Sequence, residues 1–357
     1  MKTRIIRSQD LAALVAKVGL DEIMDRMIER LAETCREFDP QRFEVRVRDG
    51  YTYEQPRVGL IEWMPVMEAG RRVTVKMVGY HPRNPSAFQL PTILSTVGAY
   101  DTDTGHLIGL SDATFLTAVR TAAASAVASQ ILARPDSRVL GIVGVGAQAV
   151  CHVHALSRCF PLEQVLIYDV DPAAVASFAQ RVAGLSPRPL EIAPATGAQI
   201  LARSDMLVTA TSVAAGAGPV VDDGHCQPGL HVNAVGADFP GKTELPLTLL
   251  QRALVCPDYS PQAMKEGECQ RLEADQIGPD LLQITKQAAT MQAHQDRLTV
   301  FDSTGFALED HVALELALEW AEQFNLGLEL DLESISDDPL NPYQFAEVDR
   351  AVAAVVS

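Results

Sequence analysis

The first third of the chain alternates apolar and polar residues in a way that predicts a mostly antiparallel sheet. Phe43, Val45 and Val47 alternate with charged residues, and this two-residue period is typical of a strand with one solvent-exposed face. Apolar residues at helical spacing come before them. We expect helices at 8–18 and 21–37, and strands at 43–47, 59–64, 73–78, 95–100 and 106–110.

From residue 112 onward, short apolar runs are separated by helical segments. A long Ala-rich helix is predicted at 112–133, as a bridge into this second region. Such alternation is typical of a parallel, doubly wound sheet. We expect its strands at 139–143, 164–168, 190–193, 205–210, 230–235, 253–256 and 298–301. A helix at 306–326 follows, and a last helix within 329–357 is expected to return to the first region.

The predicted fold class is therefore α/β, with a Rossmann-type doubly wound parallel sheet and a separate α+β region of mostly antiparallel sheet. The 357 residues exceed one typical core and suit two domains. We predict that residues 1–125 and 305–357 form one domain, and that residues 126–304 form the other.

The stretch 138–169 contains the parts of a dinucleotide site in their usual order. A strand leads into Gly144-Val-Gly146-Ala-Gln-Ala149, a helix follows, and a second strand ends at Asp169. The helix N-terminus would face the phosphates, and Asp169 the ribose hydroxyls. A carboxylate there repels a 2′-phosphate, so we predict NAD rather than NADP. A glycine turn in some other α/β protein is the alternative. The expected cofactor residues are Gly144, Gly146, Ala147, Gln148, Asp169, Thr209 and Val235.

Composition and charge exclude several classes of function. The net charge of −17 argues against nucleic acid and anionic membrane surfaces as partners. No apolar run is expected to span a bilayer, and the N-terminus does not read as a signal peptide. The six cysteines form no CxxC pair, so we expect reduced thiols in a cytoplasmic protein. We predict no metal site.

Asp238 is the first candidate for chemistry. It follows the strand that ends at Val235, in an irregular loop that includes Pro240. Loops after strand ends face the ligand crevice in a doubly wound sheet, so Asp238 is expected beside the nicotinamide as a general acid or base. A turn aspartate that bonds its own backbone is an equally good interpretation.

Lys76, Arg120 and Glu62 form a second group of candidates, all in the first region. The two cations could hold a substrate carboxylate, which Arg binds with two parallel hydrogen bonds. On pattern alone, a solvated strand lysine is the better interpretation of Lys76. Arg120 could be a surface arginine that extends to solvent, although its helix has little polar surface. Glu62 could be an exposed strand residue.

The chain resembles the ornithine cyclodeaminase family, which includes mu-crystallin and archaeal-type alanine dehydrogenase. The motifs run through most of the chain in family order, and the last ones are nearer to bacterial ornithine cyclodeaminase. They are GLIEWMP (59–65), VKMVGYHPRN (75–84), FLTAVRTAAASAVAS (115–129), GVGAQ (144–148), HVNAVGADFPGKTEL (231–245), KEGECQRL (265–272) and FDSTGFALED (301–310).

The resemblance implies roles for the candidate residues. Lys76 and Arg120 fall where the family binds the substrate α-carboxylate, Glu62 lines the substrate pocket, and Asp238 is the acid/base. It also implies a homodimer that pairs through the antiparallel domain. One departure stands out: the family arginine eleven residues before Glu62 is Tyr51 here. Arg46 or Arg48 is then the candidate replacement, and Tyr51 and Tyr53 are expected to reshape the pocket.

The function implied by the resemblance is an NAD-dependent cyclodeaminase. It would convert L-ornithine or a related diamino acid to a cyclic imino acid such as L-proline, with release of ammonia and transient hydride transfer to bound NAD. An amino-acid dehydrogenase or an imine reductase, alanine dehydrogenase-like or opine-type, is the alternative. A non-catalytic NAD-binding protein is the third interpretation, against which an intact Asp238 argues.

Overall fold

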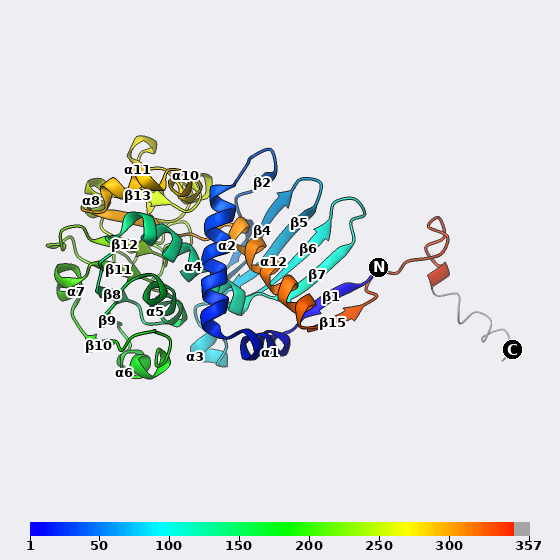
Figure 1. Cartoon of the computed structure of the whole chain (residues 1–357), viewed down its shortest axis with the longest axis horizontal. Helices are drawn as coiled ribbons and strands as arrows, with labels where there is room; N and C mark the ends of the chain where they lie inside the picture. The colour runs from blue at the N-terminus through cyan, green and yellow to red at the C-terminus, as the bar shows by residue number, and fades with distance from the viewer. Residues whose placement is uncertain (346–357) are drawn as a thin grey trace.

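A computed structural model describes residues 1–345 of the chain, and it contains two sheets side by side (Figure 1). One is largely antiparallel and the other is parallel throughout. The expected last helix cannot be assessed because residues 346–357 lie outside the described part. The fold class predicted from the sequence is confirmed.

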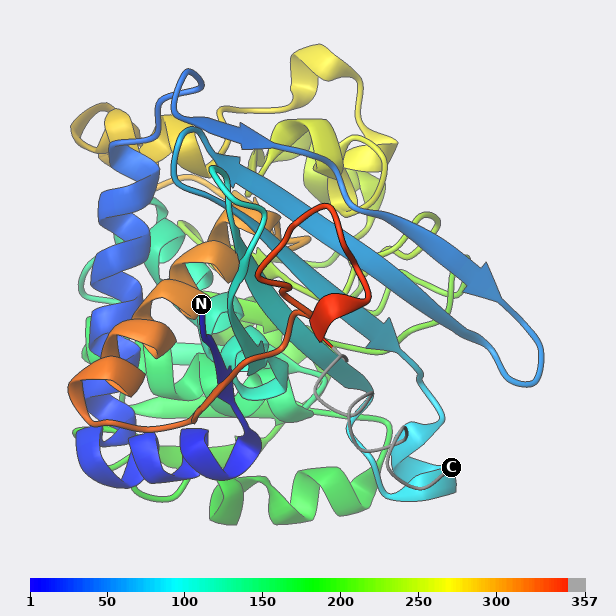
Figure 2. The ribbon, with the colours of Figure 1, turned by 90° about the vertical axis from the view of Figure 1, so that its right-hand side faces the viewer.

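The antiparallel sheet has the strand order β15-β1-β7-β6-β5-β4-β2, and β3 also pairs with β4. Among the strands of residues 1–345, the β1–β7 pair is the only parallel one in this sheet. Helix α12 covers its inner face by packing on β4, β5 and β6 (Figure 2). The bounds are β1 Thr3–Ile6, β2 Phe43–Val45, β3 Asp49–Tyr53, β4 Gly59–Glu68, β5 Arg72–Tyr80, β6 Ile93–Asp101, β7 Leu107–Asp112, β15 Leu328–Leu330 and α12 Ala307–Gln323.

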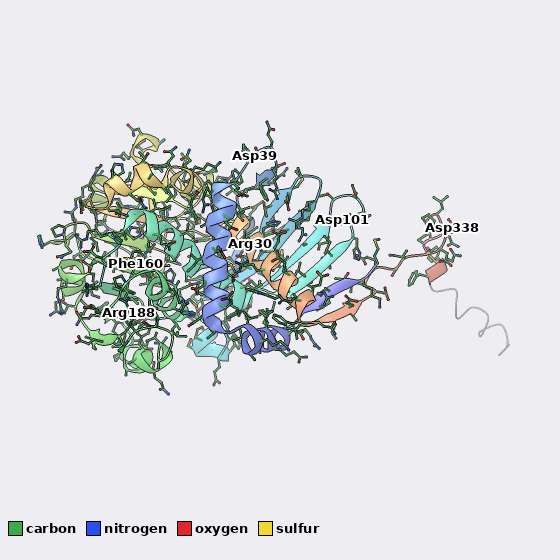
Figure 3. The ribbon with its side chains drawn as sticks, in the orientation of Figure 1. Arg30, Asp39, Asp101, Phe160, Arg188 and Asp338 are labelled. Atoms are coloured by element: carbon green, nitrogen blue, oxygen red, sulfur yellow. The ribbon has the colours of Figure 1, made fainter. Side chains whose placement is uncertain are left out.

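Further helices border this sheet. They are α1 Ser8–Val18, α2 Leu20–Arg36 and α3 Asn84–Phe88. Helix α2 packs on α12, and Arg30, labelled in Figure 3, donates two hydrogen bonds of 3.0 Å to Glu319 of α12. The predicted helices at 8–18 and 21–37 are confirmed to within one residue.

Three strands were not predicted. β1 and β15 are short strands at one edge of the antiparallel sheet, and they pair with each other from opposite ends of the chain. β3 lies in the stretch that looked like an insertion, and it pairs with β4 so that Gly50 is opposite Glu62. A Cβ atom at Gly50 would lie 2.7 Å from Glu62 Cγ. Glycine therefore allows the two strands to approach closely beside a candidate site residue.

The parallel sheet has the order β10-β9-β8-β11-β12-β14-β13, which is a doubly wound arrangement. All its neighbouring strands run in the same direction. The crevice for ligands in such sheets lies at the strands' carboxyl ends, where the order reverses between β8 and β11. The strands are β8 Val139–Val143, β9 Gln164–Tyr168, β10 Glu191–Pro194, β11 Met206–Thr209, β12 His231–Ala234, β13 Leu254–Pro257 and β14 Thr299–Asp302.

Short helices connect these strands. The α-helices are α5 Ala147–Cys159, α6 Pro172–Arg181, α7 Gly197–Arg203, α8 Leu247–Arg252, α9 Ser260–Ala263, α10 Leu281–Lys286 and α11 Ala288–Met291. The 3₁₀ segments are η1 Glu268–Arg271, η2 Ala274–Gln276 and η3 Gln292–His294. All predicted strands of this sheet are present. β8 and β9 have the predicted bounds, and the ends of the other strands are shifted by one residue.

Helix α4 (Thr114–Leu132) joins the two halves of the structure. It packs on α5, β12 and β14 on one side, and on α2, α12 and β6 on the other. In length and composition it could cross a membrane, contrary to our expectation that no segment would, but 83% of the apolar window is buried inside the fold. Its alanines therefore serve close packing between the two sheets.

Candidate active site

The glycine loop has the geometry that a dinucleotide phosphate needs. Gly144 adopts φ +90°, and a Cβ there would lie 2.7 Å from the carbonyl oxygen of Ala210. A Cβ at Gly146 would meet nothing within 4 Å, so the surface before the α5 N-terminus is open. Asp169 follows β9 and accepts a hydrogen bond of 2.8 Å from the Val145 backbone. These residues fit a dinucleotide cofactor.

A cavity lies between the two sheets and brings most predicted site residues together. Glu62, Lys76 and Arg120 enter it from the antiparallel side, and Asp238 from the loop after β12. Gln148 and Val235, which we predicted as cofactor residues, also line it. The full lining is Arg48, Leu60, Glu62, Met64, Lys76, Val78, Tyr80, Ile93, Thr117, Arg120, Thr121, Gln148, Val235, Asp238, Ser303, Thr304 and Gly305.

Lys76 is buried, so its interpretation as a solvated strand lysine was wrong. It is 1% exposed and points inward with Thr74 and Val78, while Met77 faces outward. The inner face of the sheet therefore carries this lysine, and the apolar Met77 is on the outer face. Arg120 is 4% exposed and Glu62 8%, so neither is a surface residue.

Two acids in the first turn of α12 hold the two buried cations. Lys76 Nζ donates to Asp310 Oδ1 at 2.8 Å, and Arg120 Nε donates to the same oxygen at 3.0 Å. Arg120 also donates to Glu309 at 2.5 Å. The four side chains form one compensated network behind the cavity. The cations are thereby fixed in place, which prepares them for a carboxylate ligand.

Burial sets the pKa values in this network. It lowers the pKa of Lys76 to about 7, with Arg120 acting in the same direction and Asp310 against it. Burial also raises the pKa of Glu309 to about 8 despite Arg120. For Asp310, burial would raise the pKa, but Arg120 and Lys76 outweigh it and the pKa is lowered. Asp310 is therefore the acid of this network that remains ionised.

Arg48 reaches the cavity from the segment before β3. Its Nε lies 2.9 Å from Glu266, and its Nη2 donates to the carbonyl oxygens of Thr304 and, at 2.7 Å, Gly305. Nη1 faces Glu62 at 3.5 Å. Arg48 thus connects the antiparallel side to the β14–α12 loop. Arg48 also lines the cavity.

The remaining candidates near Arg48 lie elsewhere. Tyr51 is 71% exposed on the outer side of β3, where its ring packs edge-on against Trp63, and it does not line the cavity. The structure thus does not bring Tyr51 to the predicted substrate pocket of its own chain. Arg46 pairs with Glu44 at the surface. Of the two arginines considered as replacements, Arg48 is the one at the site.

Asp238 is bound to a side chain rather than to the backbone turn proposed as the alternative. Its Oδ1 accepts a hydrogen bond of 2.6 Å from Lys242 Nζ. Across the cavity, Asp238 raises the pKa of Glu62, adding to the larger effect of burial, while Arg48 lowers it. Asp238 and Lys76 do converge on one cavity from opposite sides, as the assignment requires.

Sequence reasoning missed several residues that support the site. Glu309, Asp310, Glu266 and Lys242 occurred only inside motifs quoted for the resemblance. The available signal was two adjacent acids before an otherwise apolar helix face. Their partners come from distant segments, so spacing could not have paired them.

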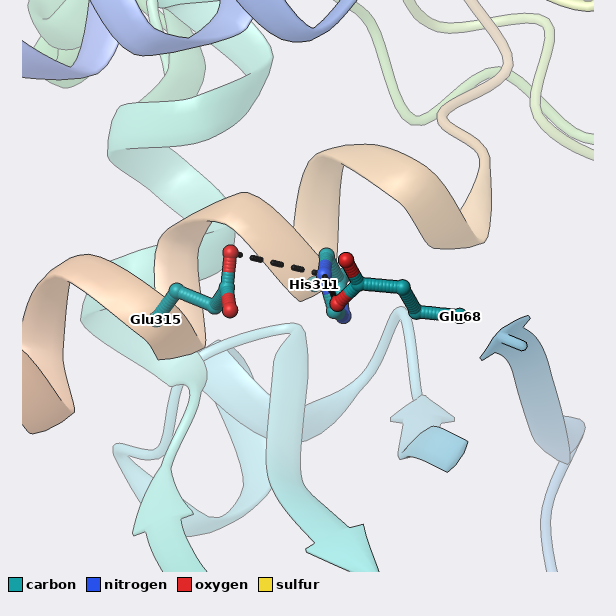
Figure 4. A group of neighbouring side chains, drawn as sticks. All are labelled: Glu68, His311 and Glu315. Carbon is teal, nitrogen blue, oxygen red and sulfur yellow. Dashed lines mark ion pairs between the residues drawn. The ribbon is translucent and has the colours of Figure 1, made fainter. Parts of the chain in front are cut away.

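One group of side chains has the composition of a metal site. Glu68, His311 and Glu315 lie together on α12 and β4 (Figure 4), with ligand atoms within 4.8 Å of one another. Arginines already hold these carboxylates: Arg42 and Arg71 bind Glu68, and Arg71 also binds Glu315 at 2.7 Å. The group is therefore arranged as an ion-pair network.

The parallel sheet, the glycine loop and the charged cavity beside it define the class as a protein with an NAD-binding fold. The family model described as "Ornithine cyclodeaminase/mu-crystallin family" matches residues 8–324, so the chain belongs to this family. The chain is 43% identical, over 96% of its own length and 99% of the relative's, to the L-lysine cyclodeaminase of Streptomyces rapamycinicus.

Solved structures of related proteins have the same fold as this chain. One titled as the basis for recognition of L-lysine, L-ornithine and L-2,4-diaminobutyric acid by lysine cyclodeaminase matches with a TM-score of 0.93 at 48% identity, over 97% of this chain and 100% of that one. An archaeal alanine dehydrogenase dimer with bound NAD matches with a TM-score of 0.81 at 27% identity, over 93% and 100%. The resemblance seen in the sequence is confirmed.

Proposed function

We propose that the chain is an NAD-dependent cyclodeaminase of diamino acids, with L-lysine as the first candidate substrate and L-ornithine the second. The observation that carries the proposal is the cavity, in which Lys76, Arg120 and Arg48 face Asp238 and Glu62 beside the glycine loop. Such a set of opposite charges suits a molecule with one carboxylate and two amines.

Either reaction is balanced without net oxidation. L-lysine would give L-pipecolate and ammonia, and L-ornithine would give L-proline and ammonia. Bound NAD would supply the acceptor for a hydride from Cα and later return it. The sequence had suggested L-ornithine or a related diamino acid, and the similarity to a lysine cyclodeaminase favours L-lysine within that class.

The residues of this chain would bind and orient the substrate. Lys76 and Arg120, with Arg48 beside them, would hold the α-carboxylate, which fixes Cα relative to the cofactor site. Asp238 would accept a proton from the reacting amine and return one to the departing ammonia. Leu60, Val78 and Ile93 form an apolar wall that would exclude water from the imine.

For the cofactor, Gly144, Gly146, Ala147 and Gln148 would bind the phosphates, and Asp169 the adenosine ribose. Thr209 and Val235 end or follow neighbouring strands, β11 and β12, on the same edge of the sheet. We also propose that residues 1–125 with 305–357 form the substrate-binding domain and 126–304 the NAD-binding domain.

A net amino-acid dehydrogenase is the second candidate, because the chain is also similar to an alanine dehydrogenase structure with bound NAD. The acid and the buried cations would suit both reactions. What favours the cyclodeaminase is the higher identity to the lysine enzyme, together with a second acid, Glu62, near a possible second amine.

One experiment separates these functions. The protein is incubated with L-lysine, L-ornithine or L-alanine, and NAD⁺ is added at a concentration well below that of the amino acid. Ammonia, NADH and cyclic product are followed together. We expect ammonia and a cyclic product in many turnovers, with no accumulating NADH. NADH that rises with each turnover would support the dehydrogenase, and neither signal despite NAD binding would exclude both.

A further inference from the structure

Lys242 is a buried cation at the site to which no role has been given. It lies four residues after Asp238 in the same loop, and its Nζ donates to Asp238 at 2.6 Å. Its side chain is 4% exposed, whereas that of Asp238 is 27% exposed. A lysine this deeply buried needs a partner for its charge, and the pairing with Asp238 provides one.

Two further residues fix the position of Lys242 and its loop. Its ammonium lies 4.8 Å from the ring centroid of Tyr80, a cavity residue at the end of β5. Gln270 accepts from the Gly241 backbone at 2.7 Å and donates to the Lys242 carbonyl at 3.0 Å. The loop is therefore held from the parallel side, while its lysine reaches the antiparallel side.

The charged side chains around Asp238 indicate the role of Lys242. Glu62 on β4 and Glu266 before η1 each act on Asp238 through repulsion, and Arg48 and Lys242 through attraction. Burial raises the pKa of Glu266 to about 8. Arg48 acts against burial, whereas Glu62 and Asp238 act in the same direction as burial. Arg48 is shared by both glutamates, whereas Lys242 bonds to Asp238 alone of the three acids.

We propose that Lys242 is a positioning residue that holds the Asp238 carboxylate in the cavity against the repulsion of Glu62 and Glu266. This inference rests on the proposed function, in which Asp238 must be a base when the substrate amine arrives. The arriving ammonium then competes with Lys242 for the same carboxylate, so the aspartate passes from one cation to the other without being left unpaired.

The pKa of Lys242 agrees with this geometry. Burial acts to lower it, but Asp238 and then Tyr80 outweigh burial, and the pKa is raised. Lys242 thus keeps its positive charge throughout the pH range in which Asp238 would work. A neutral side chain of similar size removes that charge without emptying the site, and arginine retains it.

The test compares wild type with Lys242→Met and Lys242→Arg, and uses Lys265→Gln, an exposed lysine of the same half, as the control. The pH profile of kcat/KM is measured for ammonia release. In parallel, the carboxyl carbon of Asp238 is titrated by NMR in ¹³C-aspartate-labelled protein, with Asp238→Asn to assign its signal. The NMR readout does not require the cyclodeaminase reaction.

In Lys242→Met we expect the acid limb of the kcat/KM profile and the midpoint of the Asp238 NMR titration to move up by about one to three pH units. The reason is that a nearby opposite charge lowers the pKa of a carboxyl by that amount, and the substitution removes it. Activity should recover above the shifted limb, which damage to the fold would not allow. Lys242→Arg and Lys265→Gln should stay near wild type. An unchanged NMR midpoint in Lys242→Met overturns the inference, whereas a shifted midpoint without any ammonia release overturns only the proposed function.

Discussion

At the scale of single residues, the charge of Lys76 is a sensitive property of the cavity. Burial, aided by Arg120, brings its pKa to about 7 against the pull of Asp310. Above that pH the free enzyme loses the charge that would bind the α-carboxylate. A bound carboxylate favours the charged form and so moves the loss to higher pH.

We therefore expect a basic limb near pH 7 in kcat/KM, and the corresponding limb in kcat at higher pH. The two profiles report the free enzyme and the substrate complex respectively. Steady-state rates with saturating and limiting diamino acid measure both. Identical basic limbs in the two profiles would show that Lys76 is not the titrating group.

Asp238 gives the second prediction. Asp238→Asn keeps the size of the side chain but cannot accept a proton, so ammonia release should fall about 10²- to 10⁴-fold. The affinity for NAD should remain close to that of wild type, because the glycine loop is untouched. Isothermal titration checks the affinity and an ammonia assay the rate. Full activity in this variant would remove Asp238 from the mechanism.

Arg48 and Arg46 are two residues apart and offer a matched pair. Arg48→Lys keeps a charge but loses the planar contacts to Glu266 and the Gly305 carbonyl. We expect KM for the diamino acid to rise about tenfold, which corresponds to roughly one charge-assisted hydrogen bond. Arg46→Lys, at the surface beside Glu44, should leave KM unchanged. Equal effects of the two substitutions would contradict the placement of Arg48 at the site.

At the scale of elements, the pairing of β3 with β4 depends on Gly50. A Cβ there would lie 2.7 Å from Glu62 Cγ and also meet the Ile61 carbonyl oxygen, so backbone must move. Gly50→Ala should destabilise the protein by about 1–3 kcal/mol and reduce activity. Gly197→Ala, where nothing lies within 4 Å of the new atom, is the control. Thermal unfolding of both variants measures the difference.

The elements also show what sequence patterns can and cannot predict. The inner strands of the parallel sheet are buried on both faces, so their continuous apolar runs were recognisable. The glycine motif indicated which of them leads into α5. β3 was not recognisable because Tyr51 is exposed and Gly50 is small. Lys76 was misplaced because alternation shows that a strand has two faces, but not which face meets the cavity.

The site itself was predictable only in part. Glu62, Lys76, Arg120 and Asp238 were candidates from the sequence pattern and took their roles from the family resemblance. The structure places all four on one cavity. Their partners could not be named. Asp310 pairs with Lys76 across 234 positions of sequence, and only the folded chain brings such residues together.

At the scale of the whole molecule, the antiparallel sheet has an outer face that α12 does not cover. Ile61, Met77 and Leu94 lie on β4, β5 and β6 there and are 41–42% exposed. These three apolar side chains lie on neighbouring strands, and exposed apolar surface of this kind is typical of protein interfaces. We propose that this face pairs with a second copy of the chain, in agreement with the dimer implied by the family resemblance.

A charge placed in the middle of that face tests the proposal. Met77→Glu would bury a carboxylate in the interface of each subunit, close to its symmetry mate, and the penalty should shift the protein to monomer. Light scattering after size-exclusion chromatography measures the mass over a range of concentrations. Val170→Glu, which changes an isolated apolar side chain of the parallel half that is 87% exposed, should leave the mass unchanged.

Because Met77 and Lys76 are neighbours on opposite faces of β5, Met77→Glu also shows whether pairing supports the cavity. If it does, the monomer should have a higher KM for the diamino acid, and a Met77→Glu protein that remains dimeric would place the interface elsewhere.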